Sequence, residues 1–384
     1  MRFLIFISIV LTVYTAMNAF ILYRMWSMLK RWPGVRTRLC TGLTIIALLY
    51  PLGRVWLAYS ANPASMFTVW LGSFWVVGIM YLGIFGMATL LVDTAAWLRP
   101  RQRWVEGWRG LRSPLAALAV VTTGLLMVFG YFNAQYPVVT ELNVKLPPER
   151  QLSRPWKLAV MTDIHLGAII DRDHLARLVD QVNELKPDAV VLVGDSVDSD
   201  MSPVLREDAG KELQRLRAPA GVYAVTGNHE FIGETELIVD YLESHGVEFL
   251  RDEARLVGGE LWLVGREDRA KPGFTGEERK ELADFYGQTA TRPAAPVVVL
   301  DHQPKDVATP ARLGADLMLS GHTHAGQLWP FYWLVYLQYE HVSGEAKIDD
   351  MTLYVLNGTG TWGPPVRVGN RPEILMVTLE PAGQ

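Results

Sequence analysis

Long hydrophobic stretches dominate the first third of the chain, whereas the apolar runs that follow are short and are separated by polar residues. The four long stretches cover about 3–29, 39–59, 66–92 and 114–132. Each reaches or exceeds the roughly 20 residues that an α-helix needs to cross the hydrocarbon core of a bilayer. Trp and Tyr near several of their ends are typical of membrane interfaces. We therefore predict a transmembrane region of four helices over residues 1–132.

A cleaved signal peptide is the alternative interpretation of the first stretch. Its apolar run continues well past the length of a normal signal-peptide core, and no A-x-A cleavage site follows it, which favours an anchor. Two charged residues, Arg54 and Asp93, lie in or beside the stretches. We expect both near helix ends, where Arg54 can extend to the interface; a contact with lipid phosphate or an intramembrane ion pair is the alternative.

The connections between the stretches differ sharply in charge. The first and third are basic, with Arg24, Lys30, Arg31, Arg36 and Arg38 in the first and Arg99, Arg101, Arg103, Arg109 and Arg112 in the third. The second, around residues 60–65, carries no charge. Because basic loops remain in the cytoplasm, this pattern predicts that both termini, and everything after Phe132, are extracytoplasmic.

After residue 132 the pattern changes twice. Residues 133–156 contain four prolines and no lasting period, which predicts an extended linker. From residue 157 onwards, short apolar runs such as AVVLVGD and PVVVLDH alternate with segments of helical spacing. This alternation predicts stacked α/β layers, so we expect residues 157–384 to form one α/β domain.

Charge separates the two parts of the chain further. Of 36 Lys and Arg and 40 Asp and Glu, residues 1–132 hold 12 and 2, a net of +10, which leaves 24 and 38, a net of −14, for the rest. The acidic part has no basic stripe for a phosphate backbone to follow, so we expect no nucleic-acid partner. The only cysteine is Cys40, which excludes a zinc–thiolate cluster.

Polar residues with metal-ligand chemistry follow the predicted strands. They are Asp163, His165, Asp195, Asn228, His229, His302, His322 and His324. Loops at the carboxyl ends of strands converge on the ligand site of an α/β sheet, so we expect these side chains to meet. A buried carboxylate is costly without a partner. Carboxylates, an amide and imidazoles suit Mn, Fe or Zn.

These blocks resemble the calcineurin-like metallophosphoesterase superfamily over roughly residues 157–380. The family pattern D-x-H, G-D-x-x-D, G-N-H-[DE], H, G-H-x-H is matched at each block. The segments GHTHAGQ and GTGTWGPPVRVGNRPEI are similar to those of bacterial membrane-anchored phosphodiesterases, with Ala325 in place of a usual glycine. The resemblance implies a four-layer α/β/β/α sandwich, and the charge pattern would place it on the periplasmic side of a bacterial inner membrane. It does not cover the predicted helices.

Carried over by position, the resemblance implies two divalent cations, with manganese expected and iron or zinc as alternatives. One would be bound by Asp163, His165, Asp195 and His324, and the other by Asn228, His302, His322 and the bridging Asp195. The resemblance also implies attack on phosphorus by a hydroxide between the metals. It gives His229 the role of general acid at the leaving oxygen.

Three further residues are candidates for substrate binding. Arg367 is expected either to bind a phosphate through its guanidinium fork or to form a structural ion pair. Asp198 is expected either to orient a histidine or to end a turn. Trp329 belongs to the uncharged aromatic run 328–339, interpreted either as an apolar lip that contacts the bilayer or acyl chains, or as a buried strand or lid.

Taken together, the sequence predicts a membrane-anchored, metal-dependent phosphoesterase. We expect it to hydrolyse a phosphodiester or phosphomonoester of a lipid or lipid-linked substrate, with the bilayer as its partner. Two alternatives stay open: a cytoplasm-facing hydrolase of a nucleotide-linked lipid precursor, and a non-catalytic membrane sensor or scaffold. The complete set of metal-ligand residues speaks against the second.

Overall fold

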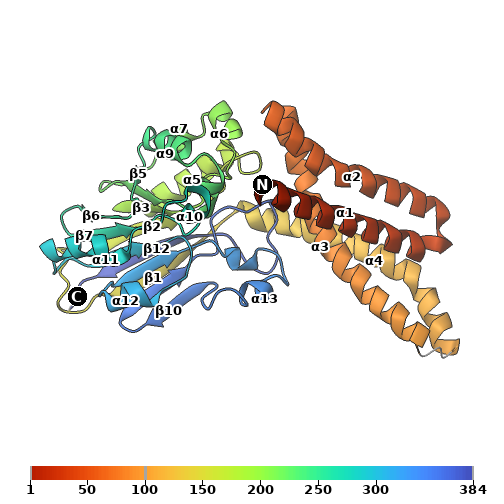
Figure 1. Ribbon diagram of the computed structural model, residues 1–384. Helices are drawn as coiled ribbons and strands as arrows, with labels where there is room; N and C mark the ends of the chain where they lie inside the picture. Colours follow the sequence, from red (N-terminus) through yellow and green to blue (C-terminus); the bar gives the residue numbers. More distant parts are fainter. Residues whose placement is uncertain (1, 99–101, 383–384) are drawn as a thin grey trace. The chain divides into compact units, whose positions relative to one another are not determined.

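The computed structural model describes residues 2–98 and 102–382. The chain divides into two compact units, residues 1–131 and 132–384, and each is described here by itself. The described part of the first unit consists of helices and short connections, and the second unit contains two β-sheets (Figure 1).

The first unit consists of long apolar helices. They are α1 (Arg2–Met28), α2 (Pro33–Tyr59), α3 (Pro63–Leu98) and α4 (Gln102–Gln135), with a short 3-10 turn η1 (Leu29–Arg31) after α1. All four are long and apolar enough to cross a membrane. The helices extend beyond the apolar stretches of the sequence, most of all α3, with 36 residues. The last four residues of α4 belong to the second unit.

An ion-pair cluster lies inside this unit. Asp93 accepts hydrogen bonds from Arg24 at 2.8 Å, from Trp108 at 2.7 Å and from Arg112. Arg24 was expected in a connecting loop, but it lies within α1 and is buried, because pairing with Asp93 offsets the cost of removing its charge from water. Asp93 therefore forms an ion pair, which was the alternative prediction for this residue. Arg99 and Arg101 lie outside the described residues.

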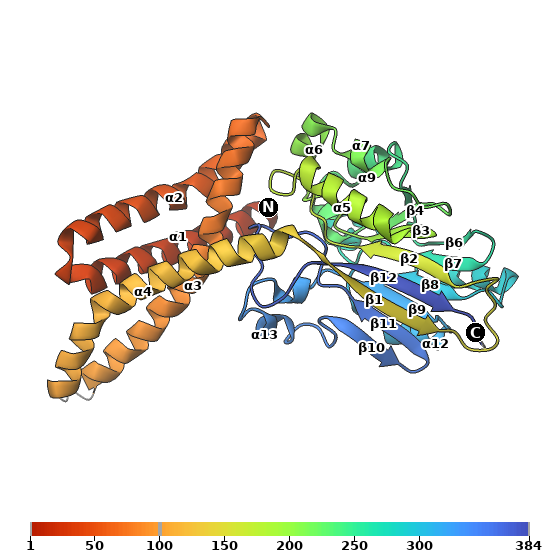
Figure 2. The same cartoon turned by 180° about the vertical axis from the view of Figure 1, so that it is seen from behind.

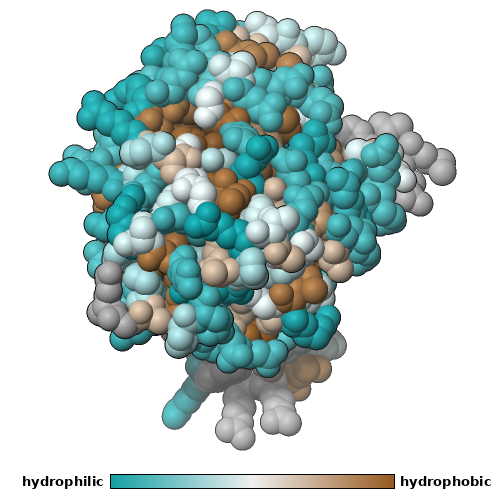
Figure 3. All heavy atoms as spheres, turned by 90° about the vertical axis from the view of Figure 1, so that its left-hand side faces the viewer, coloured by the Kyte–Doolittle hydropathy of each residue, from teal (hydrophilic) through white to brown (hydrophobic). Residues whose placement is uncertain are grey.

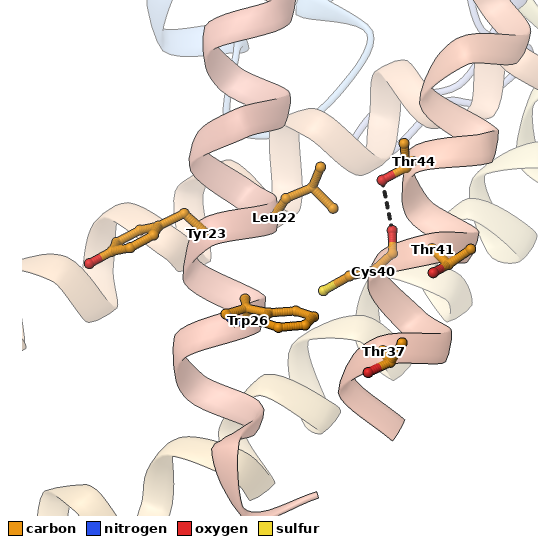
Figure 4. Close-up of a pocket in the computed structure, with 7 residues that line it drawn as sticks. All are labelled: Leu22, Tyr23, Trp26, Thr37, Cys40, Thr41 and Thr44. Atoms are coloured by element: carbon orange, nitrogen blue, oxygen red, sulfur yellow. Dashed lines mark hydrogen bonds between the residues drawn. The ribbon is translucent and has the colours of Figure 1, made fainter. Parts of the chain in front are cut away.

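A groove of about 360 Å³ opens between α1 and α2 (Figure 4). It is lined by Leu22, Tyr23, Trp26, Thr37, Cys40, Thr41 and Thr44. The hydroxyls of Thr37 and Thr44 donate to the backbone carbonyls of Pro33 and Cys40, four residues earlier. Hydroxyls satisfied in this way are compatible with an apolar environment.

The second unit is built on two six-stranded sheets. Their orders are β1-β12-β2-β3-β4-β5 and β10-β11-β9-β8-β7-β6. The strands are β1 (Val138–Lys145), β2 (Trp156–Met161), β3 (Ala189–Val193), β4 (Val222–Val225), β5 (Glu248–Phe249), β6 (Glu253–Val257), β7 (Leu261–Gly265), β8 (Val297–Leu300), β9 (Leu317–Ser320), β10 (Gly344–Ile348), β11 (Met351–Val355) and β12 (Glu373–Glu380). The central strands β2–β3–β4 and β7–β8–β9 are parallel, as the alternating pattern predicts.

Shorter helices connect these strands. They are α5 (Arg172–Leu185), α6 (Met201–Glu207), α7 (Gly210–Leu213), α8 (Asn228–Ile232), α9 (Thr235–Glu243), α10 (Lys271–Thr275), α11 (Leu282–Tyr286), α12 (Ala308–Arg312) and α13 (Tyr332–Val335), with 3-10 turns η2 (Gly287–Thr291) and η3 (His324–Gly326). Figure 1 shows α5, α6, α7 and α9 on one side of the unit.

Three hydrophobic cores hold the layers together. The sheets pack against each other through residues such as Leu158, Val191 and Leu319. The outer face of the first sheet packs on α5 and α9, for example through Leu175, and that of the second packs on α11 through Phe285. The predicted four-layer α/β/β/α architecture is confirmed. The side of this unit shown in Figure 3, towards β7 and α11, is mostly hydrophilic.

Part of the predicted linker belongs to a sheet. Residues 138–145 form β1, which pairs in parallel with β12 from Val138–Glu373 to Lys145–Glu380 (Figure 2). The alternation of exposed and buried residues in β1 marks an edge strand with one solvated face. Its partner β12 lies more than 200 residues later in the sequence, so the pairing is not visible in the local pattern. Only Tyr136 and Pro137 separate α4 from β1.

Candidate dinuclear metal centre

The predicted metal-ligand residues lie at one end of both sheets. Asp163 and His165 follow β2, Asp195 follows β3, and Asn228 follows β4 in the first sheet. His302 follows β8 in the second sheet, and His322 and His324 follow β9. The carboxyl ends of these parallel strands therefore bring together side chains that are up to 161 positions apart in the sequence.

Two adjacent clusters of possible ligands result. Asp163, His165 and His324 form one, and Asp195, His302 and His322 form the other; a third group, His165, Asp195 and His229, overlaps both. In the first, Nε2 of His324 lies 3.3 Å from Oδ1 of Asp163 and 3.1 Å from Nε2 of His165. In the second, Nε2 of His302 lies 3.2 Å from Oδ2 of Asp195. Asp195 also lies 3.8 Å from His165, so its carboxylate stands between the clusters, as a bridging ligand would.

The backbone is strained where it presents these groups. Asp163, His165, Asp195, His322 and His324 all have φ between 48° and 68°, a region that residues other than glycine rarely adopt. Two glycines make room for the carboxylates. A Cβ on Gly227 would lie 2.1 Å from Oδ1 of Asp195, and one on Gly321 would lie 2.4 Å from Oδ2 of Asp163. The glycines of the GNHE and GHTH segments are therefore required by close approach.

The donor atoms fit divalent cations. Nδ1 of His302 lies 2.7 Å from the carbonyl oxygen of Val193 and donates to it, which points Nε2 at Oδ2 of Asp195. A cation bound between these two atoms would take the place of the Nε2 proton. Oδ1 of Asn228 is buried and has no hydrogen-bond partner among the described residues. Such an orphaned oxygen is a natural metal ligand.

Burial and charge shift the titration of the cluster. Burial raises the pKa of Asp195, but His302 outweighs burial and lowers it well below its ordinary value. Burial lowers the pKa of His165 to about 4 and, assisted by the charge of His302, that of His322 to about 3. Ionised Asp195 and neutral His165 and His322 are the forms that bind metal. Burial raises the pKa of Asp163 to about 6, and for His302 burial is outweighed by Asp195, which raises the pKa well above its ordinary value. These two groups would therefore release protons when a cation binds.

The imidazole of His229 lies beside the clusters and has hydrogen-bond partners of its own. Its Nδ1 lies 3.2 Å from Oδ1 of Asp198 and 3.0 Å from Oγ of Ser199. Burial lowers the pKa of His229, but the hydrogen bond to Asp198 and the charge of Asp195 outweigh burial and raise it to about 9. Asp198 was a candidate for substrate binding or for orienting a histidine, and its contacts support the second role.

Glu230 connects the loops that carry the ligands. Its buried carboxylate accepts hydrogen bonds from the backbone N–H groups of Asp195, Ser196, Val197 and Gly227. The loop after β3 and the loop after β4 are therefore fixed to each other. The sequence motif contained Glu230, but nothing in the sequence indicated this structural role.

Arg367 differs from both of its predicted roles. It is fully buried and does not line the cavity described below. Its guanidinium donates to the carbonyl oxygens of Gly358 and Gly360 and to Oδ1 of Asn370, and Nη2 lies 3.2 Å from Nδ1 of His324. Arg367 therefore supports His324 from behind and does not face substrate. The carbonyl partners replace the ion pair that was the alternative, because a buried guanidinium needs several acceptors.

A cavity of about 530 Å³ opens over the clusters. Its polar wall includes Asp195, Asn228, His229 and His322. Its other wall is apolar and includes Phe331, Leu334, Val335, Tyr339 and Trp362. The cavity is of the size that binds small molecules.

The aromatic run 328–339 forms the rim of this cavity. It is not a buried strand: α13 lies in it, and Trp333 and Leu337 are 66% and 81% exposed. Trp329 is 59% exposed but does not line the cavity. Trp362, which the sequence reasoning did not single out, does. Its segment was quoted for the resemblance, but no local signal separates Trp362 from a surface tryptophan.

Comparison with known proteins agrees with this class of site. A sequence profile of the calcineurin-like phosphoesterases matches residues 157–326. A Danio rerio transmembrane protein with a metallophosphoesterase domain is 34% identical over 281 residues, which cover 69% of this chain and 62% of the relative. An uncharacterized metallophosphoesterase of Campylobacter jejuni is 32% identical, with 68% of this chain and 69% of the relative covered. One from Helicobacter pylori is 28% identical over 80% of each chain.

The fold, the strand-end clusters and these relatives define a metallophosphoesterase domain joined to apolar helices. The chain belongs to the calcineurin-like phosphoesterase family, and the predicted resemblance is confirmed. It spans about 62% of the length of the fish and bovine transmembrane relatives. Membership implies divalent metal ions, for which the two clusters are the candidate ligands.

Proposed function

We propose that this protein is a membrane-anchored dinuclear-metal phosphoesterase that hydrolyses a phosphodiester or phosphomonoester of a lipid or lipid-linked substrate. The observation that carries the proposal is the single cavity that joins a polar wall of ligand residues and His229 to an apolar, exposed rim. Seven residues would hold the cations: Asp163, His165, Asp195, Asn228, His302, His322 and His324. Manganese is the expected metal, with iron or zinc as alternatives.

When bound, two divalent cations would supply an acidified water and neutralise charge on the phosphoryl oxygens. The chain's own residues supply the rest. Asp195 holds negative charge between the two clusters. His229 faces the cavity with its Nδ1 held by Asp198 and Ser199, so Nε2 is free to give a proton to the leaving oxygen. Its raised pKa favours the protonated form that this step needs.

The two walls of the cavity support the proposed substrate class. Cations held by the two clusters of candidate ligands would suit a phosphoryl group. Phe331, Leu334 and Trp362 offer an apolar surface that an acyl or prenyl chain could cover. A small hydrophilic ester would leave this apolar wall exposed to water. The uneven distribution of basic residues supports an extracytoplasmic domain, on the periplasmic side if the membrane is a bacterial inner membrane.

Hydrolysis by the purified full-length protein tests the proposal. The manganese-loaded protein would be offered lipid phosphodiesters, lipid phosphomonoesters and soluble nucleotide esters, with Asp195→Ala as the inactive control. We expect lipid ester cleavage that the control lacks. Faster cleavage of soluble esters would contradict the lipid substrate. Bound metal with no turnover of any ester would favour the sensor or scaffold alternative.

A further inference from the structure

Six exposed aromatic and leucine side chains lie within one short segment next to the cavity. We define the aromatic surface as Trp329, Phe331, Trp333, Leu334, Tyr336 and Leu337. Each of these side chains is between 39% and 81% exposed. The run 328–339 that contains them carries no charge. An apolar surface of this kind, rich in Trp and Tyr, is typical of residues at a membrane interface.

The hydrogen bonds of the second unit connect this surface to the end of α4. Nδ2 of Asn133, in the last turn of α4, donates to the carbonyl oxygens of Arg367 at 3.0 Å and Asn370 at 2.7 Å. In the same loop, the carbonyl oxygen of Val368 accepts from the backbone N–H of Trp329 at 2.7 Å. The base of the aromatic surface is therefore one loop away from Asn133.

Asn133 directly follows the apolar part of α4 and is therefore expected at the end of a membrane span. The apolar part of α4, residues 114–132, has 19 residues, and at about 1.5 Å per residue it is about 28 Å long, close to the thickness of the hydrocarbon core. Phe132 is its last apolar residue and is 62% exposed. Asn133 is then the first polar residue beyond the core, at the level of the interface.

Two arginines lie at the same level. Arg177 donates to Oε1 of Gln135, and Arg371 donates to the carbonyl oxygen of Tyr136. Both arginines are exposed, so their charges are available to lipid phosphates. Arginine side chains can bind the lipid headgroups, while exposed aromatic side chains next to them can reach the acyl chains below. Such a pair of neighbouring groups suits the interface of a bilayer.

We propose that the aromatic surface docks into the interface of the bilayer on the side where α4 ends. Only Tyr136 and Pro137 lie between α4 and β1, so the domain begins within a few residues of the end of the helix. Since Phe331 and Leu334 also line the cavity, docking would open the cavity towards the membrane. That consequence for substrate access rests on the proposed function, whereas docking itself does not.

Fluorescent labels in the full-length protein test docking directly. Cys40 would be replaced by C40S, and an environment-sensitive label attached at W333C or L337C, with F274C as the matched control. Phe274 is 57% exposed and lies in α10, outside the aromatic surface. The proteins would be reconstituted in vesicles of neutral and anionic phospholipid, some with nitroxide-labelled acyl chains, and some exposed to a water-soluble quencher.

We expect the labels at W333C and L337C to be quenched several times more strongly by the nitroxide lipids than the label at F274C. The water-soluble quencher should show the reverse order. Equal quenching at all three positions would overturn the proposal. The Asp195→Asn variant should dock like the wild type, which separates docking from catalysis. Docking without lipid hydrolysis would remove only the proposed function, and lipid hydrolysis without docking would remove only this inference.

Discussion

The side chain of Asn133 donates a 3.0 Å hydrogen bond to the carbonyl of Arg367, whose own guanidinium lies 3.2 Å from Nδ1 of His324. Asn370 strengthens the connection, because it accepts from Arg367 and donates to the carbonyl oxygens of His324 and Ala325. A chain of hydrogen bonds therefore runs from the last turn of α4 to a candidate metal ligand. The helix that anchors the domain also supports its metal site.

Asn370→Ala should weaken binding of the metal at the Asp163–His165–His324 cluster. Outer partners of metal ligands typically change affinity by about 10- to 100-fold, because they fix the orientation of the ligand. Asn133→Ala should have a smaller effect in the same direction, since it acts one step further away. Titration of the metal-free protein would measure both, with Asn143→Ala on the exposed face of β1 as control. Unchanged affinity in Asn370→Ala would show that the connection is only structural.

Asp195→Asn should reduce binding of both metals, because the carboxylate lies between the two clusters and an amide carries no charge to neutralise a cation. Metal analysis after gel filtration would measure the bound equivalents. Asp188→Asn is the matched control, since Asp188 precedes the same strand, β3, at its opposite end, where it pairs with Arg154. Two equivalents retained in Asp195→Asn would contradict the bridging assignment.

His229→Gln should keep both metals and slow turnover. Loss of a general acid typically costs about 10²- to 10⁴-fold in rate. The loss should be smallest for substrates whose leaving group is a weak base, because such an oxygen needs no proton. Steady-state rates on esters with leaving groups of graded pKa would test this. A uniform loss on all of them would assign His229 to binding.

His174 is buried outside the metal site and should make the stability of the fold sensitive to acid. It is buried in the first turn of α5, and burial together with Arg177 lowers its pKa to about 4 from its ordinary 6.5. The unfolded chain takes up a proton as pH falls below about 6.5, whereas the folded protein does so only near 4. Stability is therefore complete above pH 6.5 and falls towards pH 4, by on the order of 3 kcal/mol.

Thermal unfolding of the metal-free protein in detergent at pH 8 and pH 5 would test this. His174→Gln should lose part of the difference between the two pH values, while His341→Gln should preserve it. The same pH difference in His174→Gln as in the wild type would show that other groups cause the acid sensitivity.

The charge pattern predicts the side of the membrane. A protease site or tag after Gln384 should be accessible from outside in intact cells whose outer envelope has been permeabilised. A tag in the basic region after α1 should be protected. The reverse result would place the metallophosphoesterase domain in the cytoplasm and favour a nucleotide-linked lipid substrate.

The sequence by itself indicated the helices, the central strands and the candidate ligand residues. Each depends on a local signal: an apolar run of sufficient length, an apolar run of strand length, or a short polar motif directly after a strand. The motif residues Asp163, Asp195 and His322 could be recognised because parallel strands place their carboxyl ends at one edge, whatever the details of packing. Arg24 was misplaced because its partner, Asp93, is 69 positions away.

Only the tertiary structure decided what surrounds these motifs. The pairing of β1 with β12, the position of Arg367 behind His324, and the exposure of the aromatic run all depend on contacts between distant segments. Arg367 and Trp329 carry side chains that suit a phosphate or an apolar ligand, but residue type does not say which way a side chain points. The burial of a side chain, its hydrogen-bond partners and the direction in which it points all depend on tertiary packing. For these residues the packing partners come from segments that are far apart in the sequence.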